Sequence, residues 1–322
     1  MKAIVYEKYG PPDVLQLKEV EKPSPKDDEV LIKVLAASVN DGDSSVVRGK
    51  PFLVRLMPGG PLKPKNKIPG GDVAGRIEAV GRDVNQFQPG DEVFGDLGAC
   101  GFGAFAEYVC APENALTLKP ASTTFEEAAA VSQAALVALQ GLRDAGKIQP
   151  GQKVLINGAS GGVGAFAVQI AKSFGAEVTG VCSTGNLDLV RSIGADQVID
   201  YTQEDFTKSG QRYDLILDNV ANLSVSDYMR ALSPKGNYIA VAFNPVALIL
   251  GPLISLIGSK EVGAFLHRPN VKDLIIMKEL LEAGKVVPVI DRRYPLSEVA
   301  EAFRYFGEGH VRGKVVITVE HN

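Results

Sequence analysis

Hydrophobic and polar residues alternate in a strand-like way over the first 120 residues of the chain. Short runs with a period of two are separated by turn residues, a pattern that predicts β-strands. The runs are Ile4–Tyr6, Val14–Lys18, Glu29–Ala37, Gly75–Val80, Glu92–Phe94 and Ala104–Val109. The first part of the chain is therefore predicted to be β-rich.

The pattern changes at Thr123. A helical run, Ala128–Leu142, comes first, and strand-like and helix-like runs then alternate. The predicted strands are Val154–Asn157, Val178–Val181, Gln197–Asp200, Tyr213–Asp218, Asn237–Ala242 and Glu261–Leu266. Alternation at this spacing predicts an α/β domain in which helices cover both faces of a parallel sheet.

The C-terminal segment is predicted to return to the β-rich part. It reads as a helix over Val271–Gly284, a strand over Val286–Ile290, a helix over Tyr294–Phe306 and a strand over Lys314–Val319. The predicted domains are residues 1–124 together with 268–322, and residues 125–267.

A glycine-rich turn, Gly158–Gly164, follows the strand that ends at Asn157. Its glycines let the turn close and let backbone N–H groups approach an anion, and an amphipathic helical run starts directly after it. The N-terminal end of that helix supplies a positive dipole end. The alternative is a turn that merely needs positive φ. The strands on either side favour dinucleotide binding. The predicted pyrophosphate contacts are Ser160, Gly161, Gly162, Val163 and Gly164.

The end of the next strand distinguishes NADPH from NADH. NAD sites usually carry Asp or Glu there, about 20 residues after the turn, and this acid would repel a 2′-phosphate. Here the strand is followed by Ser183, Thr184 and Asn186, whose side chains can donate hydrogen bonds to phosphate oxygens. We therefore predict NADPH, with Tyr201 at its adenosine end. The alternative is that the two hydroxyls only cap the following helix.

Composition and charge narrow the class of protein. The chain has 322 residues with 45% hydrophobic and 22% charged residues, as in ordinary globular proteins. A net charge of −4 without a basic block argues against nucleic acid as a partner. Three scattered cysteines are too few for a disulfide framework, and the N-terminus lacks signal-peptide character. We therefore expect a cytoplasmic protein.

One apolar run, residues 246–258, is interrupted by Gly and Pro. It is shorter than the roughly 20 residues that span a bilayer. It fits a buried loop-helix or a subunit contact, and also an apolar lip over an active site or a patch on a membrane surface. An oily substrate suits the last two interpretations.

The order of these parts and a set of short motifs resemble the medium-chain dehydrogenase/reductase superfamily over essentially the whole chain. The motifs are Gly10–Leu15, Ser38–Asp43, Pro69–Gly75 with Val80–Gly81, Pro89–Val93, Gly103–Tyr108, Gly158–Gly164, Leu189–Asp196 and Gly313–Lys314. The resemblance implies a β-rich GroES-like catalytic domain and a Rossmann-type, doubly wound nucleotide domain.

Zinc-dependent members of the superfamily carry a Cys in the segment that here reads Ala36–Asn40. They also carry a His-Glu pair where this chain has Gly71 and Asp72. Catalytic zinc needs three protein ligands, and none of the three histidines of this chain lies near these positions. We therefore predict no bound metal.

Without zinc ligands, and with Ser-Val-Asn-x-x-Asp at 38–43, the chain resembles the quinone oxidoreductase and enoyl-reductase branch. Within it, the chain resembles the subgroup of the chloroplast-envelope quinone oxidoreductase homologue and the mitochondrial reticulon-interacting oxidoreductase. This implies NADPH-dependent hydride transfer to quinones or to the activated C=C of α,β-unsaturated carbonyl compounds. The alternatives are a catalytically silent NADPH-binding sensor or scaffold and, less favoured, an alcohol or sugar dehydrogenase. Relatives are often dimers, so a homodimer is also considered.

In such a site a hydrogen-bond donor must take the place of zinc at the carbonyl oxygen. Asn40 is the candidate catalytic residue, and the alternative is that its amide only satisfies loop backbone. The resemblance also implies cofactor contacts from Asn219 and Val220 near the ribose, Phe243 near the nicotinamide and Lys314 on the pyrophosphate.

Overall fold

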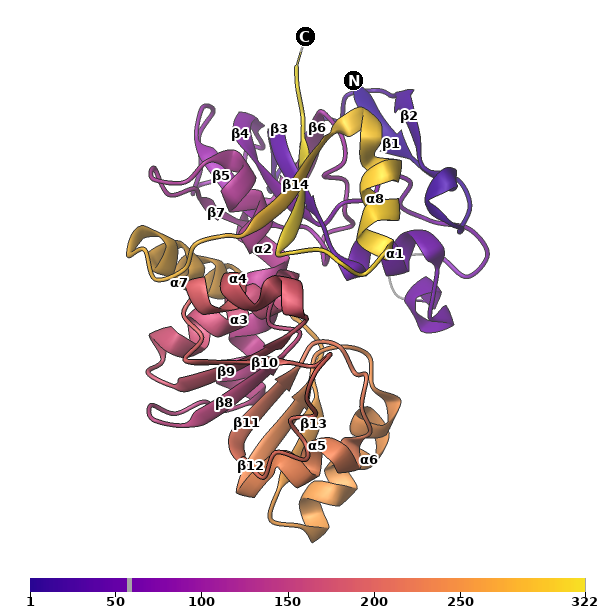
Figure 1. Cartoon of the computed structure of the whole chain (residues 1–322). Coiled ribbons are helices and arrows are strands. Elements are labelled where there is room, and N and C mark those ends of the chain that lie inside the picture. Colours follow the sequence, from indigo (N-terminus) through magenta and orange to yellow (C-terminus); the bar gives the residue numbers. More distant parts are fainter. Residues whose placement is uncertain (57–59, 322) are drawn as a thin grey trace. The chain divides into compact units, whose positions relative to one another are not determined.

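The structure is a computed structural model and describes residues 1–56 and 60–321 (Figure 1). The chain divides into two compact units. One comprises residues 1–133, 268–282 and 288–322, and the other comprises residues 134–267 and 283–287.

The first unit is built on a seven-stranded sheet of order β14-β15-β3-β4-β5-β7, in which β6 also pairs with β3. Its strands are β3 (Glu29–Val39), β4 (Asp72–Val80), β5 (Glu92–Asp96), β6 (Tyr108–Pro112), β7 (Leu116–Leu118), β14 (Ile290–Pro295) and β15 (Lys314–Thr318). A separate antiparallel pair is formed by β1 (Lys2–Val5) and β2 (Gln16–Glu19). The helices are α1 (Asp41–Arg48), α7 (Val271–Glu282) and α8 (Val299–Gly307), with short 3₁₀ turns at Pro12–Val14, Phe52–Leu56, Glu113–Ala115 and Leu296–Glu298.

The C-terminal segment is part of this sheet. β15 pairs antiparallel with β3, and β14 pairs parallel with β15. Apolar side chains that alternate along these strands form the core, and Phe105 packs edge-on against Phe303 of α8 at 5.8 Å between ring centroids. The return of the chain therefore places Lys314 next to the end of β3.

The second unit is a six-stranded parallel sheet of order β10-β9-β8-β11-β12-β13. Its strands are β8 (Lys153–Asn157), β9 (Glu177–Cys182), β10 (Gln197–Asp200), β11 (Tyr213–Asp218), β12 (Leu232–Ala240) and β13 (Glu261–Ala264). The helices are α3 (Gly162–Ser173), α4 (Leu187–Ser192), α5 (Val225–Ala231) and α6 (Pro245–Ile257), with a 3₁₀ turn at Thr184–Asn186 and a π turn at Gly141–Ala145. Helix α2 (Phe125–Gln140) carries the chain from the first unit into the second.

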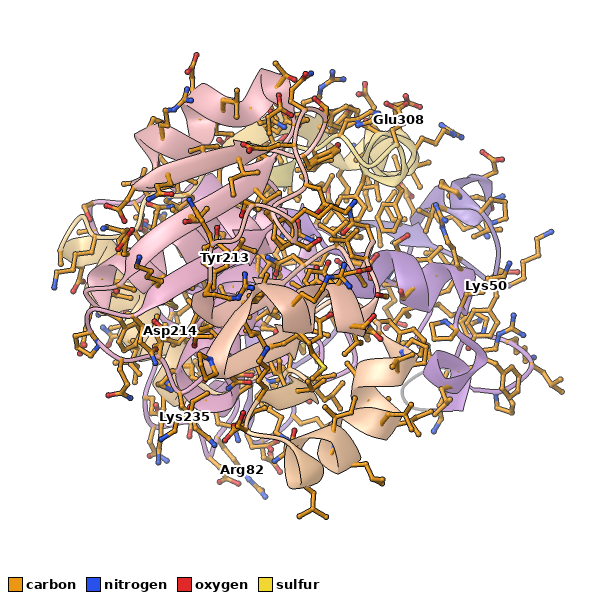
Figure 2. The ribbon with its side chains drawn as sticks, turned by 60° about the horizontal axis from the view of Figure 1, so that its bottom comes forward. Lys50, Arg82, Tyr213, Asp214, Lys235 and Glu308 are labelled. Carbon is orange, nitrogen blue, oxygen red and sulfur yellow. The ribbon has the colours of Figure 1, made fainter. Side chains whose placement is uncertain are left out.

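The strand order of this sheet reverses between β8 and β11, and in such sheets ligands bind at the carboxyl ends of the strands beside that point. Tyr213 and Asp214 begin β11 at the opposite end (Figure 2). The Asp214 carboxylate accepts the Lys153 backbone N–H at 3.0 Å and the Ser233 hydroxyl at 2.9 Å, which ties β11 to its neighbours.

The predicted doubly wound α/β domain and the predicted β-rich domain are both present. Two predicted strands, Gln197–Asp200 and Tyr213–Asp218, are present residue for residue. The predicted strand Val286–Ile290 is wrong, because the Val287 backbone N–H donates to the Gln169 side chain and the strand begins at Ile290.

Two further elements differ from the predictions. The strand expected at Ala104–Val109 lies at Tyr108–Pro112. Residues 201–212, which join β10 to β11, form turns without a helix, because the Asp205 side chain caps a turn at Thr207. Within residues 1–56 and 60–321, no helix is both long and apolar enough to cross a membrane.

Candidate active site

The register of the first unit's sheet brings polar side chains into one row. Ser38 of β3 pairs with Asp72 of β4, which in turn pairs with Asp96 of β5. β15 runs antiparallel to β3 in a register that places Lys314 beside Asn40. All five residues are buried, at ends of strands whose middle parts carry the apolar core of the unit. Strand pairing therefore assembles a polar site from segments more than 240 residues apart.

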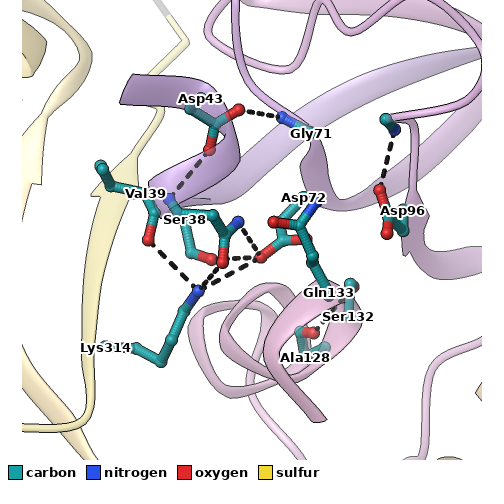
Figure 3. Close-up of polar contacts among 12 residues, drawn as sticks. Ser38, Val39, Asp43, Gly71, Asp72, Asp96, Ala128, Ser132, Gln133 and Lys314 are labelled. Atoms are coloured by element: carbon teal, nitrogen blue, oxygen red, sulfur yellow. Dashed lines mark hydrogen bonds and ion pairs between the residues drawn. The ribbon is translucent and has the colours of Figure 1, made fainter. Parts of the chain in front are cut away.

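Asp72 is the centre of this site (Figure 3). Its Oδ2 accepts hydrogen bonds from Ser38 Oγ at 2.5 Å and from Asn40 Nδ2 at 2.8 Å, and lies 3.5 Å from Lys314 Nζ. Its Oδ1 accepts the backbone N–H of Gln133 at 2.9 Å. We call Ser38, Asn40, Asp72 and Lys314 the Asp72 network.

The two charges of the Asp72 network are withdrawn from water. Asp72 is 0% exposed and Lys314 is 2% exposed. Burial raises the pKa of Asp72 and lowers the pKa of Lys314, since each charge loses its hydration. Their mutual attraction offsets part of this loss. Removing one partner of such a buried pair typically costs about 3–5 kcal/mol, because the other charge stays uncompensated.

Asp43 holds the backbone around the Asp72 network. Its Oδ2 accepts the N–H of Asn40 and its Oδ1 accepts the N–H of Gly71, both at 2.9 Å. Burial and, second, the charge of Asp72 raise the pKa of Asp43 to about 7. The carboxyl group therefore fixes two loops at once.

In the second unit, the glycine-rich turn joins β8 to α3. Gly158 has a φ of +76°, and a Cβ on Gly164 would lie 2.0 Å from the Gly158 carbonyl oxygen. Gly161 is the N-cap of α3, and Gly162 and Val163 begin the helix. The first backbone N–H groups of a helix have no partner within it. The predicted pyrophosphate contacts thus form one turn that ends in available donors.

Asn186 connects this turn to the end of β9. Its Nδ2 lies 3.2 Å from Ser160 Oγ and 3.2 Å from Ser183 Oγ. Each serine hydroxyl accepts this hydrogen bond and keeps its own hydrogen for donation. The structure therefore brings Ser160, Ser183 and Asn186 together at the carboxyl ends of β8 and β9.

Two buried amide oxygens test whether a dinucleotide fits here. Asn186 Oδ1 and Asn219 Oδ1 have no hydrogen-bond partner in the described part of the chain. Buried acceptors are normally satisfied, so each calls for a donor such as a ribose hydroxyl. Asn219 follows β11, and its Nδ2 donates to the Asn157 backbone oxygen at 2.9 Å, which holds the side chain at this edge. The residues fit the cofactor.

Thr184 departs from its predicted role. Its hydroxyl donates to Asp200 Oδ2 at 2.5 Å, so this hydrogen is already committed to a carboxylate and not to a phosphate. Tyr201, next to Asp200, is 56% exposed at the end of β10. Sequence reasoning missed this contact because Thr184 lies in the turn after β9 and Asp200 ends β10, 16 residues further along the chain.

Lys314 also differs from its predicted role. A pyrophosphate contact was predicted, but the ammonium group is buried in the Asp72 network. It donates to the backbone oxygen of Val39 at 3.2 Å and to Asn40 Oδ1, and it lies within reach of Asp72. These three acceptors match its three hydrogens.

Val220 and Phe243, which follow β11 and β12, are 47% and 67% exposed. Beside them lies a cavity of about 480 Å³ within the second unit. Its apolar lining includes Leu223, Val225, Met229, Phe243, Val246 and Ile254. The apolar run predicted from the sequence forms α6, on which Leu248, Ile249, Leu253 and Leu256 are exposed. The carboxyl ends of β11 and β12 therefore open onto an apolar surface.

All three cysteine thiols have a raised pKa. Burial raises the pKa of Cys110 and of Cys182 to about 11, and it also raises the pKa of Cys100. The thiolate is the reactive form of cysteine, so these thiols are held in their unreactive form at neutral pH.

Sequence reasoning found Asn40 but missed its partner Asp72 and the second donor to Asp72, Ser38. The signal was present, because both are polar residues inside runs that otherwise read as buried strands. A buried polar side chain needs a hydrogen-bond partner. Two such residues at the same end of neighbouring strands are therefore expected to bond to each other.

Comparisons with known proteins place this chain in a family. Residues 26–121 match the alcohol dehydrogenase GroES-like domain, and residues 193–317 match the zinc-binding dehydrogenase model. The mitochondrial NAD(P)H oxidoreductase RTN4IP1 of Mus musculus is 36% identical over 99% of this chain and 89% of its own length. The chloroplastic NADPH-dependent alkenal/one oxidoreductase of Arabidopsis thaliana is 34% identical over 98% and 79%.

Among solved structures, the quinone oxidoreductase from Coxiella burnetii matches with a TM-score of 0.89 and 32% identity, over 99% of each chain. The chain belongs to the medium-chain dehydrogenase/reductase superfamily, in its quinone oxidoreductase and enoyl-reductase branch. The predicted family is thereby confirmed.

The name of one matching family model refers to zinc, but the donor set here does not fit that ion. Gly71 offers no side chain, and the Lys314 ammonium already brings positive charge beside Asp72. Across residues 1–56 and 60–321, no three His, Cys, Asp or Glu side chains are grouped so that they could hold a metal ion.

Proposed function

We propose that this chain catalyses the NADPH-dependent reduction of quinones and of the activated C=C bond in α,β-unsaturated carbonyl compounds. The observation that carries the proposal is the amide of Asn40, which is buried, held by Asp72 and able to donate a hydrogen bond. The enzyme class agrees with relatives named as quinone and alkenal/one oxidoreductases.

Bound NADPH supplies a hydride, which reaches the β-carbon of an enone or the quinone. The π electrons of the acceptor move onto its carbonyl oxygen, and one proton from water completes the saturated carbonyl compound or the hydroquinone. Asn40 acts on that oxygen. Its amide nitrogen carries two hydrogens and gives one to Asp72, so the other is available where negative charge develops. One such donor commonly contributes about 3–4 kcal/mol.

The second unit's residues hold the cofactor in this proposal. Backbone N–H groups at the start of α3 bind the pyrophosphate. The Ser183 hydroxyl donates to the 2′-phosphate, and the side-chain oxygens of Asn186 and Asn219 accept ribose hydroxyls. The absence of an acidic residue directly after β9 supports NADPH over NADH.

A lipophilic acceptor fits the second unit best. The apolar cavity beside Phe243 and the exposed apolar face of α6 both lie at the carboxyl ends of β11 and β12. Burying apolar surface there contributes roughly 25 cal/mol per Å². The cytoplasmic location, the homodimer and a peripheral membrane contact remain predictions.

Steady-state oxidation of NADPH and NADH with the purified protein tests the function. The acceptors are a benzoquinone, a short enal and a long-chain enone, with a saturated alcohol as control substrate. Turnover of quinone or enone with a preference for NADPH is expected. Tight NADPH binding without turnover of any acceptor would instead indicate a sensor or scaffold, and alcohol oxidation would indicate a dehydrogenase.

A further inference from the structure

We infer that Lys314 is a positioning residue for this reduction: its ammonium group fixes the orientation of the Asn40 amide and strengthens that amide as a donor to the acceptor's carbonyl oxygen. The inference rests on the proposed role of Asn40. It replaces the pyrophosphate contact predicted from the sequence.

The two partners of the Asn40 side chain define which way its amide points. Lys314 has only hydrogens to donate, so the atom of Asn40 that faces it must be the carbonyl oxygen. Asp72 as a carboxylate only accepts, so the atom that faces it, at 2.8 Å, must be the nitrogen. An amide held by one partner alone could rotate and present its oxygen to the substrate. Held by both, it presents its remaining N–H.

The charge of Lys314 also acts on the strength of this donor. An ammonium group against the amide oxygen draws electron density from the nitrogen, and its N–H hydrogens become better donors. The effect is large because the pair lies out of water, where electrostatic interactions are strong. The backbone oxygen of Val39, at 3.2 Å, keeps the ammonium in place.

The burial of Lys314 argues against a contact with the cofactor. The side chain is 2% exposed, and Val39, Asn40 and Asp72 use its three hydrogens within the first unit. A phosphate would have to displace at least one of these acceptors. Loss of Lys314 should therefore change the chemical step and leave NADPH affinity as it was.

The test compares Lys314→Met with Lys119→Met. Lys119 is a matched control, because its side chain is 4% exposed in the same unit and pairs with Glu92 at 3.1 Å. For each variant, kcat is measured with an enone and with a benzoquinone, and NADPH affinity is measured by fluorescence titration without acceptor. The side-chain amide signals of Asn40 are followed by NMR, which reports its hydrogen bonds directly.

For Lys314→Met we expect kcat with the enone to fall about tenfold or more, as for a weakened oxyanion donor. The fall with the benzoquinone should be smaller, since that acceptor is already strongly electrophilic. The Asn40 amide signals should shift, and the dissociation constant of NADPH should change less than about twofold. Lys119→Met should leave the ratio of the two kcat values and the Asn40 signals unchanged.

Three results would overturn the inference. They are a weakened NADPH affinity at unchanged kcat, an equal loss with both acceptors, and unshifted Asn40 signals. If Lys314→Met does not fold, the double variant Lys314→Met/Asp72→Asn removes both buried charges together, and its enone-to-quinone ratio is compared with that of Asp72→Asn alone, so that the difference between them decides on Lys314. A wild-type protein that reduces no acceptor contradicts the proposed function, whereas an active wild type with an unaffected variant contradicts only this inference.

Discussion

Thr184, in the turn after β9, donates its hydroxyl hydrogen to Asp200 at the end of β10, at 2.5 Å between Oγ1 and Oδ2. Asp200 also accepts the Thr202 hydroxyl at 2.8 Å and the Thr202 backbone N–H at 3.0 Å. These bonds, led by that of Thr184, lower the pKa of Asp200 and use its acceptor positions. Ser183 is thereby the hydroxyl that remains for the cofactor.

A carboxylate at position 183 should reverse the preference between the two cofactors. In Ser183→Asp the new charge repels a 2′-phosphate and accepts a 2′-hydroxyl, so the ratio of kcat/KM for NADPH to that for NADH should fall about tenfold or more. Ser192→Asp, which adds the same charge to an exposed position of α4, should keep the ratio. An unchanged ratio in Ser183→Asp would place the 2′-phosphate elsewhere.

Removal of the Asn40 amide should slow the reaction without weakening the binding of NADPH. For Asn40→Ala we expect kcat with an enone to fall by about 10²–10³, the effect of losing one oxyanion donor. Asn85→Ala, at an exposed loop position, serves as control. Stopped-flow measurement of hydride transfer checks the prediction, and a rate within twofold of the wild type would remove Asn40 from the chemistry.

Asp43 should make the protein less stable as the pH rises from 5 to 7. Its pKa is raised to about 7 in the folded chain from an ordinary value of 3.8, so the folded state keeps a proton that the unfolded state has released. Stability from this group is therefore lost with rising pH, by about 2 kcal/mol over this range. The difference in free energy of unfolding between wild type and Asp43→Asn, followed by urea denaturation, should carry that slope. A flat difference would show that Asp43 is ionised throughout.

Two glycines of the nucleotide turn should respond differently to a methyl group. In Gly164→Ala the new Cβ would lie 2.0 Å from a backbone oxygen, so we expect a loss of about 3 kcal/mol in the free energy of unfolding. At Gly161 the nearest atom is 3.5 Å away. Gly161→Ala should therefore keep its stability and lose NADPH affinity, because the methyl group obstructs the pyrophosphate. Thermal unfolding and NADPH titration separate the two effects, and equal stability of both variants would contradict the tight turn.

Filling the apolar cavity should shift the preference of the enzyme towards acceptors with shorter alkyl chains. Val246→Trp narrows the cavity, whereas Leu248→Trp adds the same ring on α6 outside the lining. Excluding two methylene groups, at about 0.8 kcal/mol each, lowers kcat/KM for a long-chain enone relative to a short one by about tenfold. Measurement of kcat/KM for the two enones in both variants checks this. An equal change in the two variants would mean that the alkyl chain of the enone does not enter the cavity.

How far the sequence predicts this structure depends on where each residue lies. Central strands such as Tyr213–Asp218 are buried on both faces and contain a continuous apolar stretch, here Leu215–Leu217, so their limits were found. β14 lies at the edge of its sheet and carries Arg292 and Arg293. These charges interrupt the apolar pattern by which a strand is predicted from sequence. At the site, Asn40 was predicted from its own segment. Its hydrogen bonds to Asp72 and Lys314 span 32 and 274 residues, and only the sheet register reveals such pairs.

The raised pKa of the three thiols has a consequence for an enzyme that handles electrophiles. Quinones and enones are Michael acceptors, and cysteine thiolates add to them covalently. Because the pKa of Cys100, Cys110 and Cys182 is raised, a smaller fraction of each thiol is thiolate at neutral pH than in an ordinary cysteine, and its addition to the enzyme's own acceptors should be slower.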